Sequence, residues 1–110
     1  MLEAMWSVEF ISNLNDSGYG VAIFETGRIL GGDSSFTFIG SYEVVNGNVQ
    51  AKVKCSNYRE TLQSIFGDIK EFNLVFEGVP AQNEFVVRSY IPENTQMQIT
   101  VKLTRIAELP

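Results

Sequence analysis

The sequence consists largely of short runs in which apolar and polar side chains alternate. The clearest run spans residues 97–103, where Met, Ile, Val and Leu alternate with Gln, Thr and Lys. Residues 49–55 alternate in the same way and end at Cys55. Successive side chains of a β-strand point to opposite faces, so each run predicts a strand with one buried and one wet face.

Similar but shorter runs predict the remaining strands, at residues 6–10, 19–26, 28–30, 36–43, 72–77 and 84–88. Turn residues separate them, notably Thr26-Gly27, the segment Gly78 to Asn83, and Asn46-Gly47, which is typical of a type I′ hairpin turn. We interpret Gly18-Tyr19-Gly20 and Gly31-Gly32-Asp33 as turns too. Both faces of residues 19–26 are apolar, so the inner side of that strand stays open.

One segment departs from the period of two. Leu62, Ile65 and Phe66 have the i, i+3, i+4 spacing of a helix, and Gly67 would end it. We therefore predict a short helix within residues 57–67, lying across one mouth of a barrel.

About eight strands joined mostly by short turns predict an all-β fold, an antiparallel up-and-down, calycin-like barrel with one short helix, in a single domain of residues 1–110. An open two-sheet sandwich is the main rival. Closure is favoured because it removes the exposed sheet edges that invite aggregation. The residues expected to line the interior are aromatic: Trp6, Phe10, Phe36, Phe38, Tyr42, Phe72 and Phe76.

A barrel of this size either is filled by its side chains or holds one small ligand. The many phenylalanines favour a mostly filled interior. The alternative is a carrier whose seven aromatic residues contact a small apolar ligand, which would need a cavity of roughly 300 Å³ or more.

The chain carries a net charge of −5, from 13 acidic and 8 basic residues. A phosphate backbone would on balance be repelled, so direct nucleic-acid binding is not expected, whereas a basic protein partner is compatible. No apolar run is long enough to span a membrane, and the N-terminus lacks a signal peptide pattern, so we expect a cytoplasmic protein. The single cysteine, Cys55, is predicted to be a buried, inert thiol.

The residue types for common enzyme chemistry are missing. The sequence contains no histidine, which removes the usual general base, the commonest zinc ligand and serine–histidine triads. Carboxylate pairs can hydrolyse glycosides, but residues such as Glu9, Glu25 and Glu84 fall at outward or turn positions. We predict a non-enzymatic protein without metal or cofactor.

Some apolar residues fall on the face opposite the predicted core. Met5, Ile11 and either Val86 or Tyr90 could form a contact surface there. Non-enzymatic barrels commonly pair through two-fold contacts, so a homodimer is predicted.

The first 60 residues resemble the GrlR family, the negative regulators of bacterial type III secretion gene clusters. The likeness rests on the run WSVEFISN from Trp6 to Asn13, then Asp16-Ser17, Gly20, Gly27, Gly31-Gly32-Asp33, Gly40 and Asn57-Tyr58. The tryptophan of the first strand, here in Ala4-Met5-Trp6, is similar to the Gly-x-Trp opening of lipocalins and would close the barrel floor.

The resemblance implies a bacterial, dimeric, calycin-like barrel without catalytic activity. It also implies an anti-activator that captures a transcriptional activator carrying a helix-turn-helix. The family's regulator has the acidic run Glu-Asp-Glu-Asp in the loop that corresponds to residues 43–48, where this chain reads EVVNGN. Of that motif only Glu43 can be carried over; the candidate partner loop is Glu43, Asn46, Gly47 and Asn48.

Overall fold

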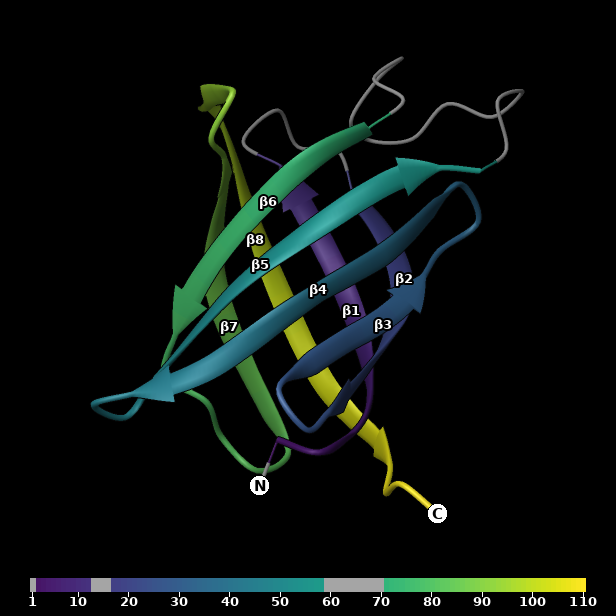
Figure 1. Cartoon of the computed structure of the whole chain (residues 1–110), viewed down its shortest axis with the longest axis vertical. Helices are drawn as coiled ribbons and strands as arrows, with labels where there is room; N and C mark the ends of the chain where they lie inside the picture. The colour runs from purple at the N-terminus through teal and green to yellow at the C-terminus, as the bar shows by residue number, and fades with distance from the viewer. Residues whose placement is uncertain (1, 13–16, 59–70) are drawn as a thin grey trace.

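A computed structural model describes residues 2–12, 17–58 and 71–110. In this part of the chain eight antiparallel strands follow one another around a closed barrel (Figure 1). They are β1 (Ala4–Ser12), β2 (Ser17–Glu25), β3 (Arg28–Gly32), β4 (Phe36–Val45), β5 (Asn48–Asn57), β6 (Glu71–Gly78), β7 (Glu84–Ile91) and β8 (Asn94–Ala107). The predicted up-and-down barrel is confirmed.

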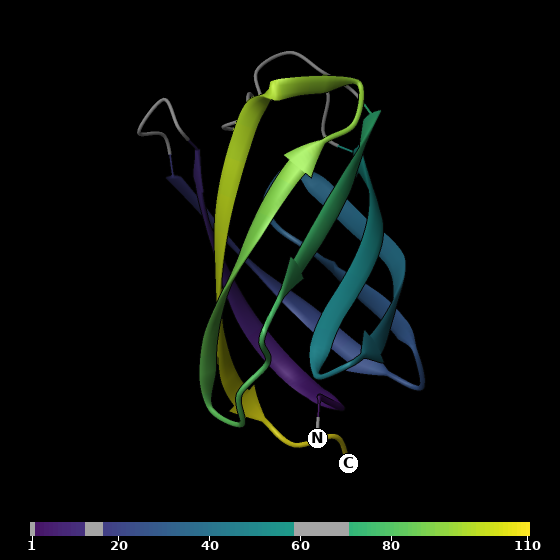
Figure 2. The same cartoon turned by 90° about the vertical axis from the view of Figure 1, so that its left-hand side faces the viewer.

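The first and last strands close the sheet. β1 pairs with β8 from Met5 opposite Ala107 to Ser12 opposite Ile99, so the sandwich alternative is wrong. The shortest stretch of pairing joins β6 to β7, from Val75–Tyr90 to Glu77–Arg88. Figure 2 looks onto this side of the barrel.

Two hairpin turns follow directly from their sequences. Asn46 and Gly47 have φ angles of 52° and 82°, the positive pair that a type I′ turn needs, and Thr26 and Gly27 have 49° and 77°. Such turns match the twist of the flanking strands, so both predicted hairpins are confirmed.

The alternating rows meet inside the barrel. In β5, Val49, Ala51, Val53 and Cys55 are buried and the residues between them are exposed. On β2 the inner row is Ala22 and Phe24, which settles the side that the sequence left open. The core comprises Leu2, Ala4, Trp6, Val8, Phe10, Ala22, Phe24, Ile29, Phe36, Phe38, Val49, Ala51, Val53, Cys55, Phe72, Leu74, Phe76, Phe85, Val87, Ile91, Ile99, Val101 and Leu103.

The glycines of Gly18-Tyr19-Gly20 and of Gly31-Gly32 are strand residues of β2 and β3, so their assignment to turns was wrong. They occur where backbones approach closely: a Cβ on Gly20 would lie 2.8 Å from the Gly32 carbonyl oxygen.

The predicted helix falls outside the described residues, apart from Asn57, which ends β5, and Tyr58. The described part of the chain contains no helix that could cross a membrane.

Candidate functional site

The barrel interior is filled by its own aromatic residues. Of the seven predicted interior residues, six are buried and Tyr42 is partly buried. Their rings pack on one another: Phe10 lies 5.3 Å from Phe38 between ring centroids, and Phe36 lies 5.4 Å from Phe72. Mutual packing of this kind uses the space that a ligand would need.

The cavity that remains is small and apolar. It has a volume of about 30 Å³ and a purely apolar lining, which includes Phe10, Phe38 and Phe76. Cavities that hold drug-sized ligands start at roughly 300 Å³. Among the described residues, this interior gives the carrier alternative no support.

One end of the barrel is closed by a cluster around Trp6. The Trp6 indole N–H donates to the Leu2 carbonyl oxygen at 2.9 Å, and its ring lies 5.1 Å from that of Phe85. The Arg105 guanidinium lies 4.9 Å from the centre of the Trp6 ring and donates to the Gln82 carbonyl oxygen at 2.6 Å. Trp6 thus forms a floor, as predicted. The contacts that Leu2 and Arg105 make with Trp6 were not predicted, because strand alternation does not reveal them.

Cys55 is buried on the inner face of β5. Burial raises the pKa of its thiol to about 12, and the nearby Asp33 carboxylate acts in the same direction. A thiol with this pKa carries little thiolate near neutral pH, so Cys55 is not favoured as a nucleophile.

The polar residues that are buried in the described part of the chain are serines. No described aspartate or glutamate is buried, and the buried polar residues are Ser12, Ser35 and Ser89. Among the described residues, no group of three or more His, Cys, Asp or Glu is placed to hold a metal ion.

The predicted partner loop lies at the tip of the β4–β5 hairpin. Glu43, Asn46, Gly47 and Asn48 are all exposed there, and the adjacent Val44 and Val45 are 51% and 38% exposed. Asn46, Gly47 and Asn48 therefore lie together at an accessible turn, and Glu43 lies two register positions away from it on β4, opposite Gln50.

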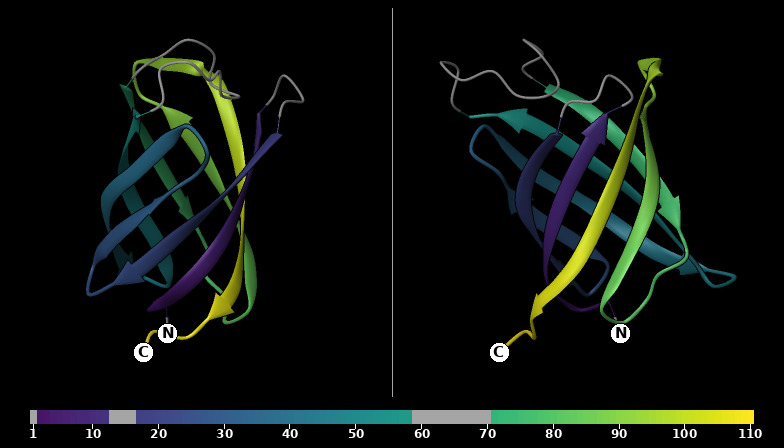
Figure 3. Two further views of the ribbon diagram at one scale, coloured as in Figure 1. Left: turned by 90° about the vertical axis from the view of Figure 1, so that its right-hand side faces the viewer. Right: turned by 180° about the vertical axis from the view of Figure 1, so that it is seen from behind.

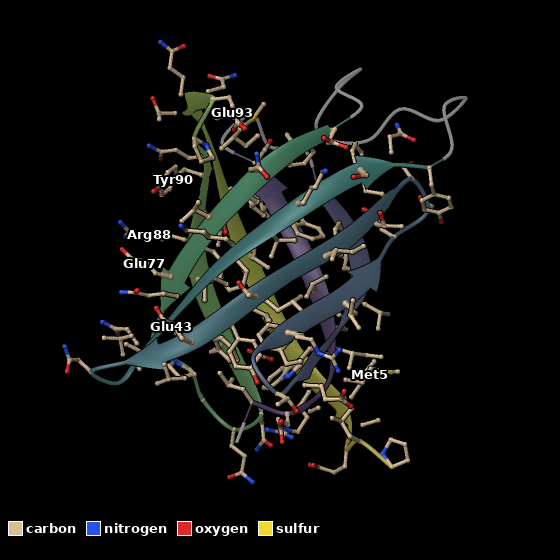
Figure 4. All side chains as sticks on the ribbon, viewed as in Figure 1. Met5, Glu43, Glu77, Arg88, Tyr90 and Glu93 are labelled. Carbon is tan, nitrogen blue, oxygen red and sulfur yellow. The ribbon has the colours of Figure 1, made fainter. Side chains whose placement is uncertain are left out.

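From this hairpin a row of polar side chains crosses the outer face of the barrel. Glu43 is opposite Gln50, Gln50 is opposite Glu77, and Glu77 is opposite Arg88. We call Glu43, Gln50, Glu77 and Arg88 the polar row. In Figure 4, Glu43, Glu77 and Arg88 follow one another along one side of the molecule.

Three shallow hollows in the outer face meet at Glu77. One, of about 530 Å³, also contacts Glu43 and Lys52; a second, of about 360 Å³, contacts Asn48 and Val86; a third, of about 660 Å³, contacts Arg88 and Tyr90. A surface of this shape can accept side chains of a macromolecular partner.

The carboxylates of the polar row are available for a partner. Glu43 and Glu77 form no ion pair with any residue in the described ranges, whereas Lys54 pairs with Glu71 at 3.3 Å and Lys102 with Glu84 at 3.6 Å. Sequence reasoning found Glu43 but missed Glu77 and Arg88, because their proximity depends on the pairing register of β4 to β7.

The predicted outer apolar cluster is only partly assembled. Ile11 and Tyr90 line the same hollow, and Val86 lies on the same outer face of β7. Met5 lies near the other end of β1 and is apart from Tyr90 in Figure 4. The cluster is wrong in including Met5, since outward residues six positions apart on a strand are about 20 Å apart.

No protein-family model matches this chain, and no curated protein matches it. The resemblance to the GrlR family therefore stays a prediction.

Proposed function

We propose that this chain is a non-enzymatic regulatory binding protein of the GrlR type, an anti-activator that sequesters a basic helix-turn-helix transcriptional activator in the bacterial cytoplasm. Its binding surface would be the polar row together with the tip of the β4–β5 hairpin. The small interior cavity of about 30 Å³ among the described residues supports a binding surface on the outside of the barrel.

The observation that carries the proposal is the pair of exposed carboxylates on Glu43 and Glu77. They flank Gln50 across two strand spacings, about 10 Å in all, and neither forms an ion pair within the described residues. DNA-binding helices carry arginines and lysines for phosphate contacts, and these side chains can pair with carboxylates instead.

Charge supports the same partner class. A chain with a net charge of −5 attracts a basic protein over long range and repels DNA. A helix-turn-helix protein held by its basic face could not contact its operator at the same time.

The test is a pull-down from a bacterial lysate with three baits: the wild-type chain, the double variant Glu43→Gln/Glu77→Gln, and the control Glu93→Gln. Glu93 is also exposed, and it accepts a hydrogen bond from the Asn73 side chain at 2.9 Å, which glutamine can still accept. We expect the wild type and the control to recover a DNA-binding protein that the double variant loses. Recovery of no such protein, or equal recovery by the double variant, would contradict the proposal.

A further inference from the structure

Exposed valines lie beside the polar row, next to the tip of the β4–β5 hairpin. Val45 is opposite Asn48, and Asn48 lines one hollow with Gly78 and Val86. Val79 follows Gly78 in the chain, and Val45, Val79 and Val86 are 38%, 70% and 53% exposed. We call these three valines the valine patch. The right panel of Figure 3 shows the hairpin tip projecting past the end of β6 at this place.

The valine patch runs parallel to the polar row. On β4, Val45 lies two residues after Glu43, and on β7, Val86 lies two residues before Arg88. Residues two apart on a strand point to the same face about 7 Å apart, so a charged row and an apolar row lie side by side on the outside of the barrel. An α-helix is about 10 Å across, so one amphipathic helix is wide enough to cover both rows.

The other flank of the polar row is basic. Lys52 lies there, opposite Ser41 on β4 and Val75 on β6. It lines one hollow with Glu43 and Glu77, but among the described residues it forms an ion pair with neither. Its ammonium group repels a cationic segment on that flank. A basic segment is therefore drawn to the flank that carries the valine patch.

The charges along the polar row have a fixed order. From β4 to β7 the row is acidic at Glu43, neutral at Gln50, acidic at Glu77 and basic at Arg88. Arg88 forms no ion pair with any described residue, although it is opposite Glu77. Since neighbouring strands are about 4.8 Å apart, the two glutamate positions are about 10 Å apart and the arginine position is about 5 Å further on.

These spacings fit an α-helix that lies across the strands. A helix rises 1.5 Å per residue, so residues i, i+7 and i+11 lie on one face at steps of about 10.5 Å and 6 Å. In an extended segment, residues on one face recur about every 6.8 Å, which does not match the step of about 10 Å between the two glutamate positions.

We propose that this surface binds a single amphipathic α-helix that lies across β4 to β7. Basic residues at positions i and i+7 of the helix pair with Glu43 and Glu77, an acidic residue at i+11 pairs with Arg88, and apolar residues beside them contact the valine patch. This inference rests on the proposed function, because it concerns the same surface. It adds that the partner helix carries an acidic residue, since a wholly basic helix would place a cation on Arg88.

Fluorescence anisotropy of labelled synthetic helices of 18 residues, titrated with the whole chain, tests the charge order. The first peptide carries lysine at i and i+7, glutamate at i+11, leucines beside them and a lysine on the far face. The second exchanges the i+7 lysine with the i+11 glutamate, so its composition is the same. We expect the first to bind about tenfold more tightly, because the exchange places glutamate on Glu77 and lysine on Arg88. Equal affinities, or no binding of the first peptide, would overturn the proposal.

The variant Arg88→Glu tests the third position of the helix. It should bind the first peptide about tenfold more weakly than the wild type does. A third peptide, which exchanges the i+11 glutamate with the lysine of the far face, should regain this loss on the variant. Failure of the third peptide to bind the variant more tightly than the first peptide does would show that Arg88 does not contact this position.

The valine patch is tested with the same first peptide. Val86→Ser should weaken its binding by about threefold or more, because apolar surface at the contact is lost. Ile39→Ser is the matched control, since Ile39 is 58% exposed on β4 but lies outside both rows, and it should bind like the wild type. Equal losses for the two variants would contradict the placement of the helix.

The peptide measurements and the lysate pull-down can fail separately. If the pull-down recovers the activator and the first two peptides bind equally, the proposed function stands and the charge order is wrong. If the first peptide binds selectively and the pull-down recovers no DNA-binding protein, the helix site stands and the transcriptional partner is wrong.

Discussion

At the scale of single residues, two glycines determine how closely the strands approach. A Cβ on Gly31 would lie 2.1 Å from the Val21 carbonyl oxygen, and one on Gly40 would lie 2.1 Å from the Lys52 carbonyl oxygen. Backbone atoms of paired strands cannot move aside without breaking the ladder. These positions need glycine for space, which sequence reasoning could not see because the approach is a property of the assembled sheet.

The change Gly40→Ala should therefore destabilise the barrel by about 1–3 kcal/mol, the range of overpacked sites. Urea unfolding followed by circular dichroism measures it. The neighbouring Ser41→Ala, at an exposed position, should stay within about 0.5 kcal/mol of wild type. A loss for Gly40→Ala no larger than for Ser41→Ala would show that the strands can separate.

Truncation of Ser89 should have the opposite effect on stability. Its side chain is buried, with 4% of the residue exposed, and its hydroxyl oxygen has no hydrogen-bond partner in the described structure. A buried polar group without a partner costs about 1–3 kcal/mol. We expect Ser89→Ala to raise the free energy of unfolding by about 1 kcal/mol. A loss of stability in the same urea assay would mean that the hydroxyl is bonded in solution.

At the scale of elements, alternation predicted the strands well. β1, β5 and β8 each bury the expected row, because burial on one face leaves a period of two in the sequence. β2 could not be assigned a face, because its outer row, Val21 and Ile23, is as apolar as its inner row.

The β4–β5 hairpin provides a test of turn geometry separate from crowding. Gly47 has a φ of 82°, and a Cβ there would meet nothing within 4 Å. Gly47→Ala should cost about 1 kcal/mol from backbone strain alone. Asn46→Gly, at a φ of 52°, should be tolerated within about 0.5 kcal/mol. Equal effects of the two changes in thermal unfolding would argue against a type I′ turn.

At the scale of the whole molecule, closure converts eight amphipathic strands into a filled core and an outer surface. The sequence predicted the core and the hairpin of the candidate site. It could not predict that Glu77 and Arg88 join Glu43 in one row, because that depends on how four strands align. The Trp6 floor was predicted only in part. The contact of Arg105 with Trp6 was not predicted, because the two residues are far apart in the sequence.

Alkaline pH should destabilise the barrel through its interior. Burial raises the pKa of Cys55 from 9.0 to about 12, so above pH 9 the unfolded chain releases a proton that the folded chain keeps. This contribution is complete below pH 9 and is lost as the pH rises toward 12. The free energy of unfolding should fall by up to about 1.4 kcal/mol per pH unit in that window, and less steeply in Cys55→Ala. Parallel slopes for the two proteins in urea titrations would contradict this origin.

We propose that the outer polar row captures a DNA-binding activator, and a gel-shift competition tests this most directly. The barrel is titrated into a preformed complex of the captured activator with its operator DNA. We predict that the wild type releases the DNA in proportion to its concentration and that Glu43→Gln/Glu77→Gln does not. A barrel that binds the operator itself, or that leaves the activator on its DNA at saturating concentration, would contradict the account.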